Sequence, residues 1–500
     1  MPRPEITGKT PDPAAPTAPS ISTPAPPTPP GRVWPVVLVA CAGQFLVILD
    51  VSVVNVALPS MRTELGLTAT GLQWVVSVYS IAFAGFMLLG GRAADLFGRK
   101  RMFVAGLSLF TLASVAGGLA QEGWHLLAAR AVQGLGAAVL SPSTLTLVTA
   151  TVPEGAARSR AVGTWTAVGA AGGAAGGFIG GALVDLLSWR WVLLINVPIG
   201  AVVLAGALLW LTESRVEGGR RLDLPGAILV TAGLATLAYG IVQTEESGWT
   251  SASTVISLAA GALLLLTFVL VERRAPAPLM PLRIFRTRAV SAANVTMLLC
   301  GSSSFGMWFF MTLYAQNVLG YPPLEAGLAL VPSSASVIAG SKLAPRLLPA
   351  FGARTVAVTG ALVAASGFAW QSTMTVDGTY LTAILLPGIL MMFGIGMAST
   401  PLAVLATTQA PPSEAGLASG LINTSRTMGG ALGLATLSTV AATVTAGATT
   451  AEALTSGYAA AFRTAACVLV GTAAVMAVWL PRLEKRARGE RPTRTTSADR

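Results

Sequence analysis

The sequence predicts an all-α integral membrane protein, and three observations support this prediction. Hydrophobic residues make up 53% of the 500-residue chain, and charged residues only 11%. A soluble domain has roughly 25% charged residues, so this chain has too few to cover a water-facing surface of its size. The apolar residues also fall into runs of about 20, the length that spans a bilayer core. Such spans must be helical, because a backbone in lipid has to satisfy its own hydrogen bonds.

Short polar breaks divide the apolar part of the chain into fourteen expected spans. Six spans precede a central pair and six follow it, so we expect two six-helix bundles with two extra helices between them. Parts of the two longest spans, at 289–318 and 416–446, are expected to be loop. The expected spans are 34–58, 73–91, 102–120, 124–148, 161–184, 191–211, 224–242, 253–271, 289–318, 324–342, 354–372, 380–402, 416–446 and 459–480.

The basic residues predict the orientation of the chain in the membrane. When fourteen spans alternate, 27 of the 32 Lys and Arg residues fall on the side that holds both chain ends. Only Arg62, Arg190 and Arg463 fall on the other side, while Arg130 and Arg426 fall within spans. The positive-inside rule therefore places both termini in the cytoplasm. This pattern explains the net charge of +11 better than nucleic-acid binding does, so no nucleic-acid partner is expected.

The chain is expected to have five parts. Residues 1–33 form a Pro-rich, disordered cytoplasmic tail, which lacks the apolar core of a signal peptide. Residues 34–211 form the N-terminal bundle, residues 212–288 the two extra helices with cytoplasmic loops, and residues 289–480 the C-terminal bundle. Residues 481–500 form a basic cytoplasmic tail.

The composition also argues against several kinds of chemistry. The three cysteines, Cys41, Cys300 and Cys467, all fall within apolar spans, so no disulfide framework is expected. His125 is the only histidine, which makes a histidine-based metal site or proton relay improbable. The chain has no Gly-Lys-Ser/Thr phosphate-binding motif, so ATP is not expected to drive it. We therefore expect neither an enzyme nor a metal or cofactor site.

Two charged residues lie inside the first and fourth spans. Asp50 belongs to the segment LDVSVVNVALP, and Arg130 to LLAARAVQGLGAAVLSP. Arg130 should lie ~9 Å and Asp50 ~12 Å from the outer edge of the membrane, from the helix rise per residue. Because a charge in a membrane needs a counter-charge or water, we hypothesise that the two residues are partners. The alternative interpretation of Asp50 is a packing hydrogen bond that fixes the bundle.

Two glycine-containing segments complete the pattern. In GGAAGGFIGG, Gly172, Gly176 and Gly180 form one stripe, and Gly173, Gly177 and Gly181 form a second beside it. Such stripes let membrane helices pack closely.

The segment GRAADLFGRKR joins the second and third spans. There, Gly91 and Gly98 permit a close approach and a tight turn. Asp95 is spaced to pair with Arg99 at i,i+4.

In their order along the chain, these motifs resemble the major facilitator superfamily, and specifically its fourteen-helix drug:proton antiporter branch (EmrB/QacA-type), over residues 34–480. The segments WRWVLLINVPIG and GLASGLINTSRTMGGALG support the same branch. The resemblance implies the major facilitator fold and proton-coupled efflux of drug-like or antibiotic small molecules by alternating access. The proton gradient would supply the energy without a cofactor.

The resemblance also implies roles for particular residues. It implies proton coupling at Asp50 and Arg130, a cytoplasmic gating loop with Gly91, Asp95, Gly98 and Arg99, and an antiporter motif at the glycine stripes. The proline of that motif is replaced by Gly177, which leaves strict antiport open. Candidates for a substrate cavity, each of which could instead be a packing or interface residue, are Trp74, Tyr79, Gln133, Trp165, Trp308, Gln316, Asn423 and Arg426.

Two alternatives to a drug exporter stay open. One is a carrier for another cargo, such as a metabolite or lipid, or an uncoupled facilitator. The other is a membrane sensor or structural protein. The 28 arginines against 4 lysines suggest a GC-rich bacterial gene. We therefore expect a multi-pass protein of the bacterial plasma membrane that functions as a monomer and contacts small-molecule substrate and lipid.

Overall fold

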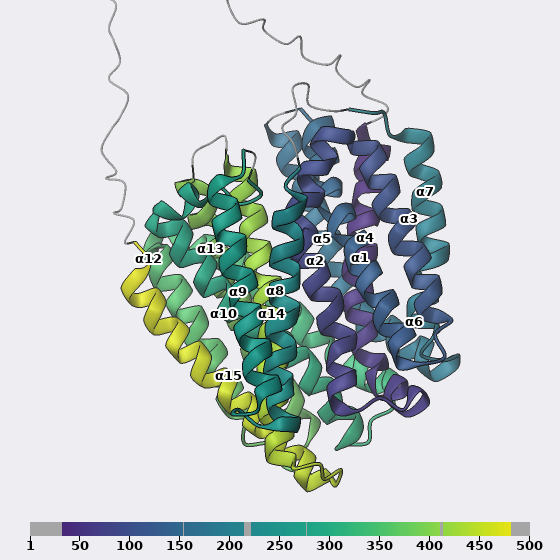
Figure 1. Ribbon diagram of the computed structural model, residues 1–500, viewed down its shortest axis with the longest axis vertical. Coiled ribbons are helices and arrows are strands. Elements are labelled where there is room, and N and C mark those ends of the chain that lie inside the picture. The colour runs from purple at the N-terminus through teal and green to yellow at the C-terminus, as the bar shows by residue number, and fades with distance from the viewer. Residues whose placement is uncertain (1–32, 154, 215–221, 277, 411–413, 482–500) are drawn as a thin grey trace, which may run out of the picture.

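The computed structural model describes residues 33–153, 155–214, 222–276, 278–410 and 414–481, and the two expected tails lie almost wholly outside this part of the chain. The described residues form helices and no strands (Figure 1). Thirteen helical segments in this part are long and apolar enough to cross a membrane. The expected all-α membrane fold is confirmed.

The helices follow one another with short connections. Their bounds are α1 Val33–Leu65, α2 Ala69–Phe97, α3 Arg99–Gly118, α4 Gly123–Thr151, α5 Ala156–Leu186, α6 Trp191–Leu194, α7 Asn196–Trp210, α8 Leu224–Ser247, α9 Ala252–Arg274, η2 Leu282–Arg286, α10 Arg288–Asn317, α11 Pro323–Ala329, α12 Val331–Gln371, η3 Leu381–Leu385, α13 Leu386–Gln409, α14 Ala415–Thr445 and α15 Ala451–Trp479.

One segment accounts for the difference between thirteen and fourteen crossings. Pro323–Gln371 is 49 residues long, which at the rise of an α-helix is ~74 Å and enough for two crossings. Gly352 interrupts α12 with φ 77° and ψ 157°, a conformation that L-residues avoid. The break expected between the spans 324–342 and 354–372 is therefore not a loop, because only Gly352 within it leaves the helical region.

Another expectation about the spans was wrong. The segments at 289–318 and 416–446 are not partly loop, because α10 and α14 are continuous helices of 30 and 31 residues. The single span expected at 191–211 agrees with the membrane-length helical segment Trp191–Trp210. A turn at Ile195 separates α6 from α7 within this segment, where Pro198 has no N–H to donate to the carbonyl of Leu194.

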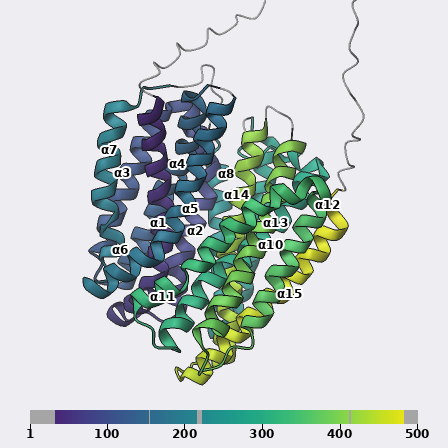
Figure 2. The same ribbon diagram turned by 180° about the vertical axis from the view of Figure 1, so that it is seen from behind.

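The helices form two bundles that meet along a contact surface, here called the seam (Figures 1 and 2). Helices α1–α7 make up one bundle and α10–α15 the other. In the seam, α2 packs on α14, α5 on α11, and α1 on α10. The extra helices α8 and α9 pair with each other, and α8 lies against both α2 and α14.

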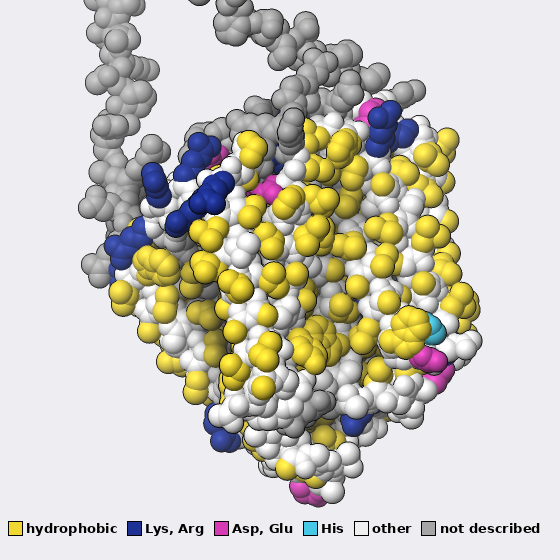
Figure 3. All heavy atoms as spheres, viewed as in Figure 1, with side chains coloured by type: hydrophobic (Ala, Val, Ile, Leu, Met, Phe, Trp, Pro, Cys, Tyr) yellow, Lys and Arg dark blue, Asp and Glu magenta, His cyan; other side chains and the backbone are white. Residues whose placement is uncertain are grey.

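The two ends of the molecule differ in charge. We call the end at which α1 begins and α15 ends the tail face, and the other end the opposite face. The Lys and Arg side chains visible in Figure 3 gather mostly at the tail face, and apolar side chains cover the flanks between the two ends. The exposed apolar flank and polar ends are those of a multi-pass membrane protein.

Candidate functional site

A buried ion pair lies inside the first bundle. The Nη1 atom of Arg130 on α4 lies 2.7 Å from Oδ2 of Asp50 on α1. Their side chains are 2% and 0% exposed. The structure thus brings together the two residues that the sequence suggested as partners, although the chain separates them by 80 positions.

Three further polar side chains complete the surroundings of Asp50. The Nε2 atom of Gln133 donates to Oδ1 of Asp50 at 2.7 Å, and Nδ2 of Asn196 donates to the same oxygen at 2.8 Å. The hydroxyl of Ser114 accepts from Gln133 at 2.8 Å and from Asn196 at 3.3 Å. Both Asp50 oxygens therefore have partners, and helices α1, α3, α4 and α7 meet at this cluster. We call these five residues, Asp50, Ser114, Arg130, Gln133 and Asn196, the charge cluster.

The rest of the Arg130 guanidinium is held by α2 and α4. Its Nε donates to the carbonyl of Val75 at 3.2 Å, and its Nη1 also donates to Oε1 of Gln133 at 2.6 Å. The ring of Tyr79 lies 4.2 Å from Cζ of Arg130, a cation–π distance. The Nε and Nη1 atoms and one face of the guanidinium thus contact polar or aromatic groups of the same bundle.

Sequence reasoning missed Asn196 and Ser114. Asn196 stands in a segment that matched the family only as a whole, and Ser114 in a plain apolar span. A signal existed for Asn196, because it is a polar residue inside an apolar span, directly before the Val197-Pro198 pair.

Four cavity candidates lie away from the seam pocket described below. Gln133 and Tyr79 are 1% and 2% exposed and surround the ion pair instead. Trp165 donates from Nε1 to the hydroxyl of Thr144 at 2.9 Å within the first bundle. Trp74 packs in an apolar cluster with residues of α8 and α14. In this structure these four residues lie among packed side chains, and their role in binding substrate stays a prediction.

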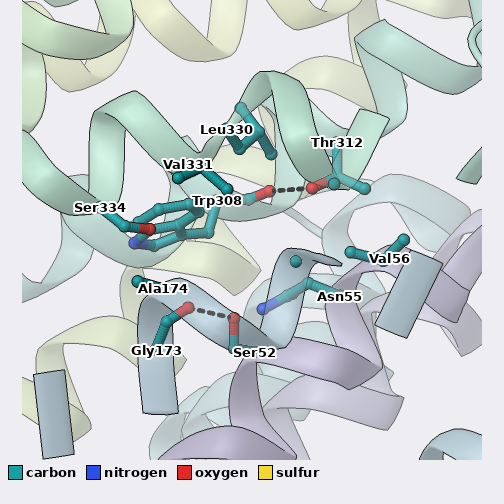
Figure 4. Close-up of a pocket in the computed structure, with 12 residues that line it drawn as sticks. Ser52, Asn55, Val56, Gly173, Ala174, Trp308, Thr312, Leu330, Val331 and Ser334 are labelled. Carbon is teal, nitrogen blue, oxygen red and sulfur yellow. Dashed lines mark hydrogen bonds between the residues drawn. The ribbon is translucent and has the colours of Figure 1, made fainter. Parts of the chain in front are cut away.

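A pocket lies in the seam between the two bundles (Figure 4). One wall comes from α1 and α5 and holds Ser52 and Asn55, and the other comes from α10 and α12 and holds Trp308 and Thr312. The Ser52 hydroxyl donates to the carbonyl of Gly173 at 2.8 Å. Trp308 is thus a sequence candidate that the structure places in a pocket. The pocket walls carry no ionised side chain.

The remaining three candidates for the substrate cavity, Gln316, Asn423 and Arg426, also lie on the seam. Gln316 on α10 donates from Nε2 to the carbonyl of Val56 on α1 at 2.9 Å, joining the bundles near the opposite face. Asn423 on α14 contacts Met87 on α2, with Nδ2 3.3 Å from the sulfur. Arg426 donates from Nη2 to Oδ1 of Asn423 at 2.8 Å and is exposed.

Comparison with known proteins decides the family. The profile of the Major Facilitator Superfamily matches residues 40–434. The chain belongs to the Major Facilitator Superfamily. It is a multi-pass membrane transporter of small molecules and not an enzyme.

Similar proteins include several antibiotic exporters. The transporter is 47% identical to a cephamycin export protein of Amycolatopsis lactamdurans, over 82% of this chain and 85% of that protein. It is 39% identical to a puromycin resistance protein of Streptomyces alboniger, over 89% and 91%. It is 37% identical to a multidrug resistance protein of Mycobacterium tuberculosis, over 80% and 74%.

Solved structures share its fold at low sequence identity. A D-xylose–proton symporter superposes with a TM-score of 0.65 at 15% identity, covering 91% of this chain and 99% of the symporter. A bacterial homologue of a lysosomal Spinster transporter, in an inward-facing state, gives 0.63 at 16% identity, covering 91% and 97%.

The glycine stripes of the transporter face two different helices. The first stripe packs on α1, since Cβ atoms added to Gly172, Gly176 and Gly180 would lie within 3.0 Å of Phe45, Ser52 and Val53 respectively. In the second stripe, Cβ atoms on Gly177 and Gly181 would lie 2.7 and 2.4 Å from Gly327 and Leu324 in the other bundle. Gly173 differs, because its nearest contact would be an ordinary 3.6 Å. The stripe of Gly172, Gly176 and Gly180 thus packs α5 against α1 within the first bundle. In the other stripe, Gly177 and Gly181 pack α5 against α11 across the seam.

The expected gating loop is mostly helix. Asp95 and Arg99 form the expected i,i+4 pair at 3.2 Å, and Gly98 with φ 109° makes the turn between α2 and α3. Glu213 accepts from the backbone N–H groups of Lys100 and Arg101, both at 3.2 Å, at the N-terminus of α3. Gly91 does not make a close approach, because a Cβ there would meet Pro142 at 3.4 Å.

Proposed function

We propose that this transporter exports drug-like or antibiotic small molecules from a bacterial cell across its plasma membrane, in exchange for protons, by alternating access. The antibiotic exporters among its relatives support the class of cargo and the direction of transport. The gathering of Lys and Arg at the tail face supports a cytoplasmic position for that face and for both termini. The function needs no cofactor, and one chain holds both bundles and the seam.

The observation that best supports proton coupling is the contact between Asp50 and Arg130. A carboxylate buried at membrane depth persists in its charged form only while its counter-charge and hydrogen bonds compensate for lost hydration. Protonation of Asp50 would remove the charge that pairs with Arg130. The attraction that joins α1 to α4 would then weaken, so a single proton could change the relative stability of two arrangements of the bundle.

Helix α1 connects the charge cluster with the seam. Asp50 faces the bundle interior, while Ser52, two residues later, lines the seam pocket and Val53 packs against Gly180. A rotation or shift of α1 on protonation would therefore act directly on the contact between the bundles. This short path is the physical basis for coupling a proton in one bundle to opening of the seam.

The contacts across the seam support assigning the structure to one end of the transport cycle. Gly177 meets Gly327, Gln316 reaches Val56, and the carboxylate of Asp185 accepts from the N–H of Leu324 at 2.9 Å. All three contacts lie in the half of the seam nearer the opposite face. With the tail face in the cytoplasm, they would close the transporter to the outside.

The test is transport by the purified protein in proteoliposomes with an imposed pH gradient, using puromycin and a cephamycin as trial cargoes. The wild-type protein should accumulate cargo against its gradient. Asp50→Asn, which nearly preserves shape, should lose gradient-driven accumulation by about tenfold or more while still exchanging labelled for unlabelled cargo. Asp377→Asn, a change at an exposed carboxylate outside the helices, is the matched control.

The outcomes separate the alternatives. Wild-type flux that never exceeds equilibration would indicate an uncoupled facilitator, the function that the missing proline at Gly177 leaves open. Flux of neither cargo, with uptake of a metabolite or lipid instead, would indicate a different carrier. Absence of any flux would favour a sensor, and unchanged coupling in Asp50→Asn would contradict the role given to the ion pair.

A further inference from the structure

Arg426 is an exposed cation in the middle of a membrane-spanning helix. It lies eleven residues after the first residue of α14, ~16 Å along the helix axis. Arg130, in the fourth span, is buried and paired with a carboxylate. Arg426 differs from Arg130 on both counts, and Arg463 on α15 shares its exposure, so the contacts around Arg426 must show what it can bind.

The contacts of α14 show where the Arg426 side chain emerges. One turn before it, Asn423 touches Met87 on α2. One turn after it, Gly429 packs against the backbone of Leu298 on α10, where an added Cβ would lie 1.9 Å from a carbonyl oxygen. Residues 423, 426 and 429 lie within about 120° on a helix, with 426 in the centre. Arg426 therefore points between α10 and α2, which belong to different bundles, and so faces the seam.

The guanidinium of Arg426 lacks a counter-charge in the part of the chain that the structure describes. Among the described residues, its side chain has no ion-pair partner within 4.0 Å, and its hydrogen bond is to the neutral amide of Asn423. That bond uses Nη2 and leaves Nη1 and Nε, two donors of the planar fork that suits a carboxylate. A cation at this depth is costly unless water or an anion compensates for it.

Aromatic groups lie close to Arg426 along α10. The ring of Phe305 lies over Gly430, one turn from Arg426, within 2.6 Å of an added Cβ. The backbone carbonyl of Arg426 is level with Gly301 on α10, and Trp308 of the seam pocket lies seven residues further along that helix, ~10 Å away. Helix α10 thus connects the surroundings of the Arg426 cation with an aromatic, hydrogen-bonding pocket in the seam.

We propose that Arg426 binds the negative group of the cargo, and that the preferred substrates are amphipathic organic monoanions with a free carboxylate. The carboxylate takes Nη1 and Nε of Arg426, while Asn423 holds the guanidinium in place. The apolar body of the substrate extends along α10 toward Trp308. This inference rests on the proposed export function and adds to it the chemical class of the cargo and the residue that selects it.

The experiment compares acids with their neutral esters. Equilibrium binding to the full-length protein in lipid nanodiscs, with no pH gradient, is measured for benzylpenicillin and its methyl ester, and for 7-diethylaminocoumarin-3-carboxylate and its ethyl ester. The wild-type protein should bind each acid about tenfold or more tightly than its ester. Arg426→Gln should bind each acid and its ester with equal affinity. The acid preference of Arg426→Lys should lie between those of the wild-type protein and Arg426→Gln, since lysine keeps the charge but not the planar, two-donor guanidinium.

Arg463→Gln is the control, because it removes the same charge from an exposed position on α15. It should retain the wild-type preference. The inference is overturned if the wild-type protein binds neither acid or does not prefer the acids, or if Arg426→Gln keeps the preference. Because binding needs no gradient, a wild-type protein that accumulates drug with a pH gradient but ignores carboxylates would overturn the anion site alone and leave proton-coupled export intact.

Discussion

Gly177 of α5 and Gly327 of α11 meet backbone to backbone across the seam. A Cβ atom on Gly327 would lie 2.0 Å from the carbonyl oxygen of Gly177, and a Cβ on Gly177 would lie 2.7 Å from the carbonyl oxygen of Gly327. The position at which the family has a proline is therefore a contact between the two bundles. No side chain fits between the two backbones in this state.

The first prediction concerns this contact. Gly177→Ala should force the bundles apart near the opposite face and favour the state that is open there. Distances between spin labels at Thr63 on α1 and Ser456 on α15, both exposed, should shift to longer values. Gly173→Ala is the control from the same helix, because its nearest contact at 3.6 Å has room for a methyl group. An unchanged distance distribution in Gly177→Ala would contradict the closing role of this contact.

The second prediction concerns Asn196. Its amide donates to the buried carboxylate of Asp50 at 2.8 Å. Asn196→Leu removes this donor, and a hydrogen bond to a charged group contributes about 1.5–3 kcal/mol. The midpoint of thermal unfolding in detergent should therefore fall, and gradient-driven transport should fall by about tenfold. Wild-type stability and transport in Asn196→Leu would contradict a role for Asn196 in holding Asp50.

The third prediction concerns Tyr79. Its hydroxyl is buried and has no hydrogen-bond partner among the described residues, whereas its ring lies against Arg130. Tyr79→Phe should therefore leave the thermal stability in detergent equal or slightly higher. Tyr79→Leu should lower it, because it removes a desolvated cation–π contact of about 2 kcal/mol. Equal losses in both variants would show that the hydroxyl, not the ring, matters.

The fourth prediction concerns the turn between α2 and α3. Gly98 has φ 109°, and a Cβ there would lie 2.3 Å from a carboxylate oxygen of Glu213, which binds the N-terminus of α3. Gly98→Ala should lower stability by about 1–3 kcal/mol, from backbone strain and displacement of Glu213. Gly91→Ala should leave stability nearly unchanged, because the added Cβ would meet Pro142 at 3.4 Å. Thermal unfolding and transport rates of the two variants test this difference.

Much of the fold could be predicted because it depends on local composition. Long apolar runs, the charge asymmetry and the glycine spacing are visible one segment at a time. An error came where one backbone angle decides the structure. The break expected between the spans 324–342 and 354–372 stays helical except at Gly352.

The candidate site was only partly predictable. Asp50 and Arg130 stood out because charge is rare inside a span, and their similar depth and opposite charges suggested that they meet. The direction in which a side chain points depends on how helices rotate against one another, which a single span does not reveal. Gln133 and Tyr79 therefore looked like cavity residues, although both surround the ion pair.

The sequence by itself determined that this chain crosses the membrane many times, because lipid demands long apolar helices whatever their neighbours. It also determined that an acid and an arginine lie at similar depth. Only the tertiary structure decided that Asn196 and Ser114 join them, that Gly177 lies on the seam, and that Arg426 has no counter-charge among the described residues. Each of these depends on contacts between helices that lie far apart in the sequence, because packing between helices, not the local pattern, selects each partner.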